Sequence, residues 1–232
     1  MTRDEIADNL RTVRERIAAA AARAGRDASE VTLVVVTKTR GLDEVRVAVQ
    51  AGATDLGENY VQELVAKARE LGDDGVRWHA IGHLQTNKVR QVVPVVSLIH
   101  SLDSLRLAEE IERRAGAAGR TIPALVQVNV AGEDSKFGVD EAGLMDLAPR
   151  VMELQSVRLA GLMTMPPFVE EGEDNRRYFA RVRELRDDLV TRGIPADSLR
   201  ELSMGMTSDY EVAVEESATL VRVGTAIFGP RQ

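Results

Sequence analysis

A lysine follows directly on a run of apolar residues near the start of the chain. Residues 31–37 form an almost unbroken aliphatic and β-branched stretch, and Lys38 comes next. A parallel strand that is covered on both faces reads as such a run, and in barrel folds the side chains at its carboxyl end line the functional site. A partly buried lysine loses its proton more readily and can then form a Schiff base with an aldehyde or ketone. Lys38 is therefore a candidate for covalent chemistry.

Hydroxyl and glycine residues follow the last two predicted strands. Ser203 and Gly205 follow one of them, and Gly224 and Thr225 follow the other. Hydroxyl groups and accessible backbone amides bind phosphate after strands seven and eight of a barrel. We place this phosphate across the barrel mouth from the first strand. A lysine opposite a phosphate site indicates a phosphorylated aldehyde or ketone, either pyridoxal 5'-phosphate or the phosphosugar of an aldolase.

Eight apolar, β-branched runs alternate with longer segments of helical periodicity. The predicted strands are residues 31–37, 53–57, 77–81, 97–100, 123–129, 157–163, 199–203 and 219–223. A helix that begins with a capping box of Thr2 and Glu5 precedes them, and residues 59–71 and 103–118 are two of the helices between them. Such a series predicts a parallel sheet, either closed into an eight-fold barrel or open and doubly wound. A series of eight strands with no long interruption favours the α/β fold of a (β/α)8 TIM barrel with an extra N-terminal helix. We expect a single domain over residues 1–232.

Composition narrows the classes of partner. The 232 residues carry a net charge of -7 and no cysteine, which disfavours nucleic-acid binding and excludes thiol chemistry. The N-terminus is charged, unlike a signal peptide, and no apolar stretch approaches the roughly 20 residues that cross a bilayer. We expect a cytoplasmic, soluble monomer that acts on small molecules, with neither nucleic acid nor a membrane as partner.

A zinc site is not expected. His79 and His83 stand four residues apart, as they do in zinc-binding helices, but they straddle Gly82 at a predicted strand end. The acidic ligand of that motif is missing nearby.

Seven segments along nearly the whole chain carry a resemblance to a known family. They are residues 35–38 (VVTK), 57–63 (GENYVQE), 78–88 (WHAIGHLQTNK), 135–138 (SKFG), 161–165 (GLMTM), 202–206 (LSMGM) and 221–229 (VRVGTAIFG). In this order they resemble the pyridoxal phosphate homeostasis protein family, relatives of the amino-terminal barrel of alanine racemase. The resemblance implies a barrel that binds pyridoxal 5'-phosphate.

The resemblance also implies a set of cofactor-binding residues. They are Lys38, Asn59, His83, Ser203, Met204, Arg222, Gly224 and Thr225. Lys38 would form the covalent aldimine, and Arg222 would face the pyridine nitrogen. The phosphate would be held by the residues at 203, 224 and 225, with backbone amides near Met204. The residues at 59 and 83 would lie at the mouth near the ring.

The implied site favours a carrier over an enzyme. A guanidinium beside the pyridine nitrogen disfavours its protonation, which leaves the cofactor a weak electron sink. Racemases of this fold add a second domain with an opposing acid/base group, whereas this sequence runs only three residues beyond Gly229, so we expect an open site. We assign no catalytic residue and expect reversible holding of pyridoxal 5'-phosphate and its delivery to apo-forms of pyridoxal phosphate enzymes. The alternatives are a weak amino-acid racemase that uses His83 or Tyr60 as an acid/base group, and a Schiff-base aldolase.

Three further residues have expected roles. Ser217 stands where the family usually has glycine, and in a left-handed conformation it would cost up to about 1–2 kcal/mol. Lys136, in a loop after the fifth strand, would attract the phosphate or briefly take the aldehyde during release. Trp78 is expected in the core.

Overall fold

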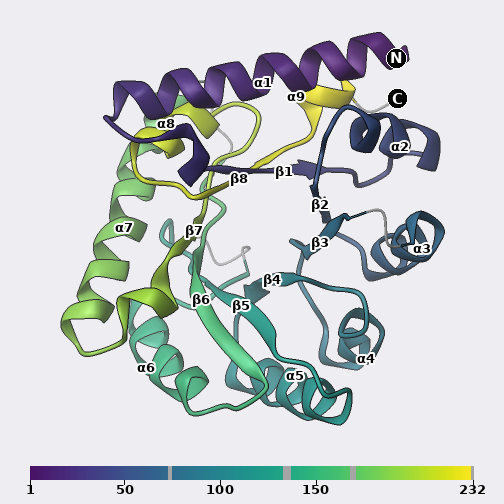
Figure 1. The fold of residues 1–232 in the computed structure, drawn as a ribbon. Coiled ribbons are helices and arrows are strands. Elements are labelled where there is room, and N and C mark those ends of the chain that lie inside the picture. The colour runs from purple at the N-terminus through teal and green to yellow at the C-terminus, as the bar shows by residue number, and fades with distance from the viewer. Residues whose placement is uncertain (73–74, 133–136, 168–170, 231–232) are drawn as a thin grey trace.

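The chain folds into a closed barrel of eight parallel strands. The computed structural model describes residues 1–72, 75–132, 137–167 and 171–230 (Figure 1). The strands are β1 (Thr32–Val36), β2 (Asp55–Glu58), β3 (Arg77–Ala80), β4 (Leu98–Leu102), β5 (Ile122–Gln127), β6 (Val157–Met163), β7 (Glu201–Ser203) and β8 (Leu220–Val223). They pair in chain order, and β8 closes the barrel by pairing with β1. The predicted barrel is confirmed, and the alternative of an open doubly wound sheet is wrong.

Helices surround the barrel, one after each strand. They are α2 (Leu42–Gln50), α3 (Val61–Leu71), α4 (Val89–Val92), α5 (Leu105–Ala117), α6 (Glu141–Met152), α7 (Arg176–Thr191), α8 (Tyr210–Glu215) and α9 (Thr225–Phe228). Short 3-10 turns lie at η1 (Ala28–Glu30), η2 (Thr86–Lys88), η3 (Gly172–Asn175) and η4 (Ala196–Leu199). Figure 1 shows the helices as a ring outside the strands, which is the layering expected of repeated β-α-β units.

The N-terminal helix α1 (Arg3–Arg23) lies across the side of the barrel where its first and last strands meet. The predicted capping box is present, with Thr2 and Glu5 each accepting from the other's backbone amide. One stripe of α1, including Ile6, Leu10 and Val13, is buried against α2, α8 and α9. The helix therefore covers the closure of the barrel.

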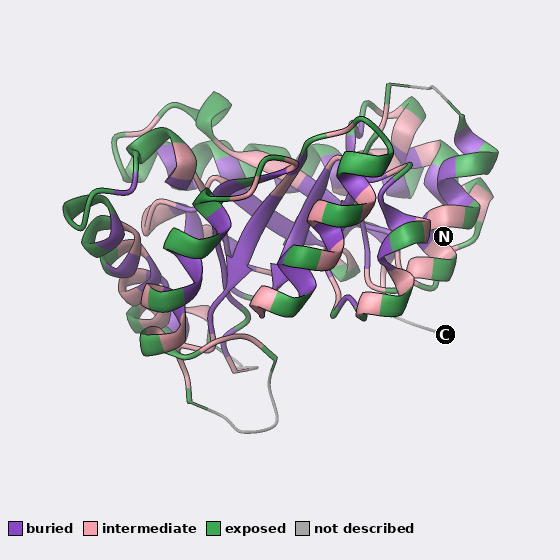
Figure 2. Ribbon diagram, turned by 90° about the horizontal axis from the view of Figure 1, so that it is seen from below, coloured by how far each residue is buried: buried purple, intermediate pink, exposed green. Residues whose placement is uncertain are grey.

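The apolar core has two parts, one between the strands and the helices and one inside the barrel. Figure 2 shows the strands buried behind helices whose outer faces are exposed. The inner cluster consists of Val34, Leu98, Leu125, Ala160, Met163 and Leu220. Trp78 is 3% exposed and packs in the outer cluster, so its predicted core position is confirmed. Buried polar side chains occupy further positions inside the barrel.

Candidate functional site

Lys38 lies at the mouth of the barrel, two residues beyond the end of β1. Val34 points inward, because it belongs to the inner cluster, and successive side chains of a strand alternate between the two faces. The same alternation directs Val36 inward, and Lys38 follows in the turn just beyond the end of the strand. Thr39 has a φ of 61°, which turns the chain immediately after the lysine, and its amide donates to Glu63 at 2.8 Å. Lys38 is thus half-buried at a strand end.

A buried ionic cluster holds the chain next to Lys38. The ammonium group of Lys67, on α3, donates to the carbonyl oxygen of Thr37 at 2.7 Å, to Oε1 of Glu58 at 2.6 Å and to Oε2 of Glu63 at 2.9 Å. Burial raises the pKa of Glu58, against the lowering effect of its hydrogen bonds from Lys67 and Thr37. All three donors of the ammonium group are used, so Lys67 fixes the backbone beside Lys38 rigidly.

Asn59 follows β2 at the level of Lys38. Val36 pairs in register with Gly57, and Lys38 and Asn59 each come two residues after this pair. Gly82 packs on the backbone of Asn59, and a Cβ at Gly82 would lie 2.3 Å from the Asn59 carbonyl oxygen. Asn59 and Lys38 therefore follow the same ends of two paired strands.

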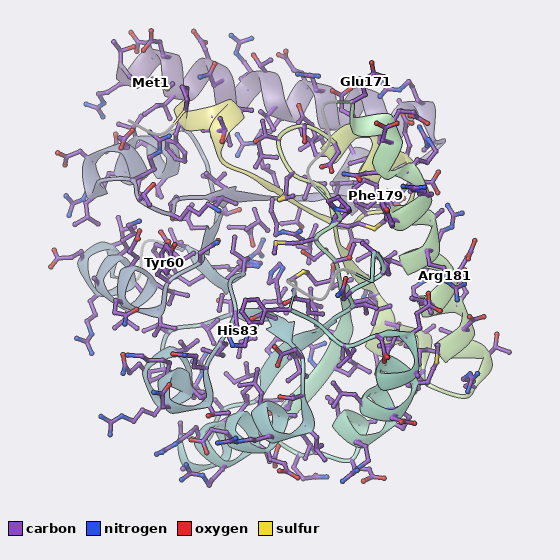
Figure 3. The ribbon with its side chains drawn as sticks, turned by 180° about the vertical axis from the view of Figure 1, so that it is seen from behind. Met1, Tyr60, His83, Glu171, Phe179 and Arg181 are labelled. Atoms are coloured by element: carbon purple, nitrogen blue, oxygen red, sulfur yellow. The ribbon has the colours of Figure 1, made fainter. Side chains whose placement is uncertain are left out.

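His83 follows β3 and carries a carboxylate partner. Its Nδ1 is 3.2 Å from Oδ2 of Asp103, and its ring stacks on Phe137 with the ring centroids 3.9 Å apart. Figure 3 shows His83 inside the ring of helices, near the strand ends, and Tyr60 farther out beside α3. Both side chains are exposed, and of the two predicted acid/base candidates His83 is the one nearer the strand ends (Figure 3).

Arg222 points into the barrel from β8 and is almost completely buried. Its Nη1 donates to Oγ of Ser203 at 2.5 Å, and its Nη2 donates to the carbonyl oxygen of Thr164 at 2.8 Å. Burial lowers the pKa of Arg222 to about 10, while the carboxylate of Asp209 raises it. The guanidinium is therefore charged near neutral pH. Arg222 pairs in register with Val34, which precedes Lys38 by four residues, so Arg222 lies deeper in the barrel than Lys38.

The turn after β8 lies beside β1, not across the mouth from it as expected, and the turn after β7 lies next to the turn after β8. A closed barrel makes the first and last strands neighbours, and a Cβ at Gly224 would lie only 3.1 Å from the carbonyl oxygen of Val36. The two turns are joined where the amide of Ala226 donates to Oγ1 of Thr207 at 3.4 Å.

The predicted phosphate-binding residues differ in whether their polar groups are exposed to solvent. Thr225 is exposed at the start of α9. The hydroxyl of Ser203 is buried against Nδ1 of His100 at 2.8 Å, and the amide of Met204 donates to the carbonyl oxygen of Leu220 at 3.1 Å. Thr225 is thus open to a ligand, whereas the Ser203 hydroxyl and the Met204 amide are engaged within the barrel.

Sequence reasoning missed a buried row of polar side chains inside the barrel. Nε2 of His79 lies 2.9 Å from Oδ1 of Asp55, and Nδ1 of His79 lies 2.8 Å from Nε2 of His100. The row continues from His100 to Ser203 and Arg222. Each of these five residues is at most 4% exposed. The available signal was a polar residue at an inward position of five of the strands, where side chains are usually apolar.

Within the described ranges, no group of three or more His, Asp or Glu residues is placed to hold a metal ion. In the same part of the chain, no helix is long and apolar enough to cross a membrane.

The residues at the mouth fit a ligand that combines an aldehyde, a ring nitrogen and a phosphate. Lys38 supplies an amine at the mouth, and Arg222 supplies a buried cation beneath it. Gly224 brings the backbone close to β1 beside the exposed hydroxyl of Thr225. These three kinds of group come from neighbouring strands, β8 and β1, and one small ligand could contact them all.

Comparison with known proteins gives matches over almost the whole chain. Residues 3–232 match the family model described as alanine racemase, N-terminal domain. The pyridoxal phosphate homeostasis protein of Aquifex aeolicus is 45% identical over 225 residues, covering 97% of this chain and 98% of that protein. The protein of the same name from Escherichia coli is 41% identical over 231 residues, covering 98% and 97%.

A solved structure is similar as well. PipY of Synechococcus elongatus, determined with PLP bound, is 39% identical with a TM-score of 0.80. The match covers 94% of this chain and 100% of that chain.

Proposed function

The chain belongs to the pyridoxal phosphate homeostasis protein family, and from that premise we propose that it binds pyridoxal 5'-phosphate reversibly in the intracellular balance of this cofactor. The similarity to a structure with PLP bound supports the choice of ligand. The geometry of the barrel mouth supports the attachment described next.

The position of Lys38 is the single observation that carries the proposal. The chain has four lysines, at positions 38, 67, 88 and 136. Lys67 is committed to its ionic cluster, Lys88 ends the 3-10 turn η2, and Lys136 lies outside the described residues. Lys38 lies two residues beyond the end of β1, at the mouth of the barrel. Its Nζ would attack the aldehyde carbon, and water would leave as the Schiff base forms.

Arg222 would face the ring nitrogen. A guanidinium that remains charged can donate a hydrogen bond to an unprotonated nitrogen, and it opposes protonation of that nitrogen. Pyridoxal 5'-phosphate, when bound, supplies an electron-withdrawing ring, and that withdrawal is weak without a proton on the ring nitrogen. Arg222 therefore suits a protein that holds the cofactor more than one that activates a substrate carbon.

Gly224 and Thr225 would hold the phosphate from the turn after β8. Ser203 and Met204 would contribute by fixing the neighbouring turn, since their hydroxyl and amide are bonded within the barrel. Asn59 and His83, which follow β2 and β3, would lie beside the pyridine ring of the ligand.

Delivery to apo-forms of pyridoxal phosphate enzymes is the second half of the proposal. Release requires access from solvent, and Thr225, His83 and Phe137 are all exposed at strand-end loops. Phe137 alone is 54% exposed. One chain supplies every residue of the proposed site, which is consistent with action as a monomer.

Absorbance spectra of the protein mixed with pyridoxal 5'-phosphate test the proposal, with wild type compared to Lys38→Ala before and after borohydride. The wild type is expected to show a Schiff-base band that borohydride removes, and the variant to lack it. Lys88→Ala, a matched control, should keep the band. An unchanged visible band in Lys38→Ala would contradict the assignment.

One observation favours a second function, a weak amino-acid racemase activity. Asp103 lies 3.2 Å from His83, and a carboxylate at that distance can orient an imidazole for proton transfer. Incubation with chiral amino acids in deuterated water would reveal exchange at Cα. Exchange at enzyme-like rates that is lost in His83→Gln would replace the carrier function with this one.

A further inference from the structure

We propose that Asp55, His79, His100 and Ser203 form a directional hydrogen-bond relay that positions Arg222 from the amino-terminal end of the barrel. The four residues come from four strands, β2, β3, β4 and β7. Only the predicted effect on ligand affinity rests on the function proposed above. The relay itself is a property of the protein without ligand.

The direction of the relay follows from what each group can donate. Arginine has no acceptor, so Oγ of Ser203 must accept from Arg222. The single hydroxyl proton of Ser203 is then free to go to Nδ1 of His100, 2.8 Å away. Neutral His100 consequently carries its proton on Nε2 and donates it to Nδ1 of His79. His79 in turn donates from Nε2 to the carboxylate of Asp55.

The charge states agree with this direction. Burial lowers the pKa of His100 well below its ordinary value, with contributions from His79 and Arg222, so its ring is neutral. Burial alone would raise the pKa of Asp55, but hydrogen bonds from His79 and Arg77 lower it overall. The row therefore has a carboxylate at one end and a guanidinium at the other, with the neutral ring of His100 and its hydrogen-bonded neighbours between them.

The arrangement is more than satisfied packing. Other strands fill the same interior with Val34, Leu125 and Ala160, so the barrel does not need polar side chains to close. Burying polar groups is costly unless every one has a partner, and here each ring nitrogen has one. The anionic end meets Arg77, whose side chain is 61% exposed, at a cavity of about 450 Å³ at the amino ends of the strands.

The orientation matters because the relay ends on Arg222. With Asp55 charged, every proton points toward the carboxylate, and a lone pair of Ser203 is left directed at the guanidinium. The carbonyl oxygen of Thr164 fixes the second guanidinium nitrogen. Reversal of the relay would make the Ser203 oxygen accept from His100 as well as from Arg222, and the guanidinium would compete for that oxygen.

Asp55→Asn tests the relay, because an amide can donate where a carboxylate cannot. In catalytic triads the same change leaves a histidine in the wrong tautomer while the geometry is kept. Nitrogen NMR of histidine-labelled protein without ligand should show both His79 and His100 with the proton on Nε2. In the variant we expect a shift toward protonation on Nδ1 and altered guanidinium signals of Arg222. Unchanged tautomers in Asp55→Asn would overturn the proposal.

Two further variants separate the relay from general damage. Arg77→Gln removes the exposed ion-pair partner of Asp55 and should leave both tautomers as in the wild type. Ser203→Ala breaks the relay beside Arg222 and keeps the bond between His79 and Asp55, so it tests the idea even if Asp55→Asn does not fold. Altered guanidinium signals of Arg222 in Ser203→Ala support the relay, and unaltered signals overturn it.

Ligand affinity supplies the last readout. Both Asp55→Asn and Ser203→Ala should bind pyridoxal 5'-phosphate about tenfold more weakly, the change expected when a hydrogen bond to a charged group is lost. Arg181→Gln, on the outer helix α7, should bind as the wild type does (Figure 3). Shifted tautomers with unchanged affinity in both variants would refute the role in ligand binding. If the wild type bound no pyridoxal 5'-phosphate, the proposed function would fail, and the NMR readouts would still decide on the relay.

Discussion

Replacing Lys67 by methionine tests the ionic cluster beside Lys38. The ion pair of Lys67 with Glu58 is deeply buried, since Glu58 is 1% and Lys67 6% exposed. The change leaves the Glu58 carboxylate with one remaining donor, the hydroxyl of Thr37. Breaking one side of a buried pair costs about 3–5 kcal/mol. The side chain of Glu63 is 30% exposed and keeps its hydration, so only one carboxylate is stranded. We therefore expect a loss of about 3 kcal/mol, at the lower end of that range.

The loss should depend on pH. Burial already raises the pKa of Glu58 in the folded protein, and removing Lys67 deletes a hydrogen bond that lowers it. A carboxyl group whose pKa is raised by folding contributes most stability below its unfolded pKa, and this contribution is lost as pH rises through the folded pKa. The deficit of Lys67→Met should therefore shrink as pH falls from about 7 to about 5.

Urea unfolding measures both effects. The fluorescence of Trp78 serves as the probe, since it is the single tryptophan and is buried. A second change, Glu58→Gln, removes the stranded charge and should restore about 1–2 kcal/mol to the variant. Arg113→Gln breaks only a surface pair with Glu110 and should cost about 0–1 kcal/mol. A destabilising role for the stranded Glu58 charge is refuted if Lys67→Met lowers the free energy of unfolding no more than Arg113→Gln does at neutral pH. It is also refuted if the double variant Lys67→Met, Glu58→Gln is no more stable than Lys67→Met.

Three other substitutions have defined outcomes. Ser217 has a φ of 76°, so Ser217→Gly should stabilise the fold by about 1 kcal/mol and raise Tm by about 2–4 °C, and a lower Tm would contradict this. Gly161→Ala should prevent folding, because its Cβ would lie 1.8 Å from the carbonyl oxygen of Glu201, and a native circular dichroism spectrum would disprove it. Gly205→Ala places a Cβ 2.6 Å from that of Ala213 and should weaken ligand binding about tenfold by shifting the turn. Titration with pyridoxal 5'-phosphate checks it, and wild-type affinity would count against a role for this turn.

The elements that the sequence predicted well are those with strong local signals. The aliphatic run before Lys38 predicted a covered strand, which is β1, and the capping box at Thr2 marked the start of α1 within one residue. Ser217 has a φ of 76°, which is the condition under which a cost was predicted for a residue other than glycine at this position. In each case a few adjacent residues determine the local backbone.

The parts that sequence reasoning missed depend on contacts between distant strands. His79 and His100 are 21 residues apart, and nothing local shows that their ring nitrogens meet. The neighbouring positions of Gly224 and Val36 follow only from closure of the barrel. Ser203 was predicted as a phosphate ligand from its hydroxyl, yet that hydroxyl turns inward to Arg222. The phosphate role of Ser203 stays a prediction, since side-chain direction at a strand end depends on the whole barrel.

Peptide mapping after borohydride reduction tests the central claim most directly. The protein is mixed with pyridoxal 5'-phosphate, reduced, digested and analysed by mass spectrometry, so that each of the four lysines is scored separately. We predict that the adduct forms at Lys38 and that it is lost in Lys38→Ala. An adduct found mainly at Lys67, Lys88 or Lys136, with Lys38 unmodified, would contradict the proposed site.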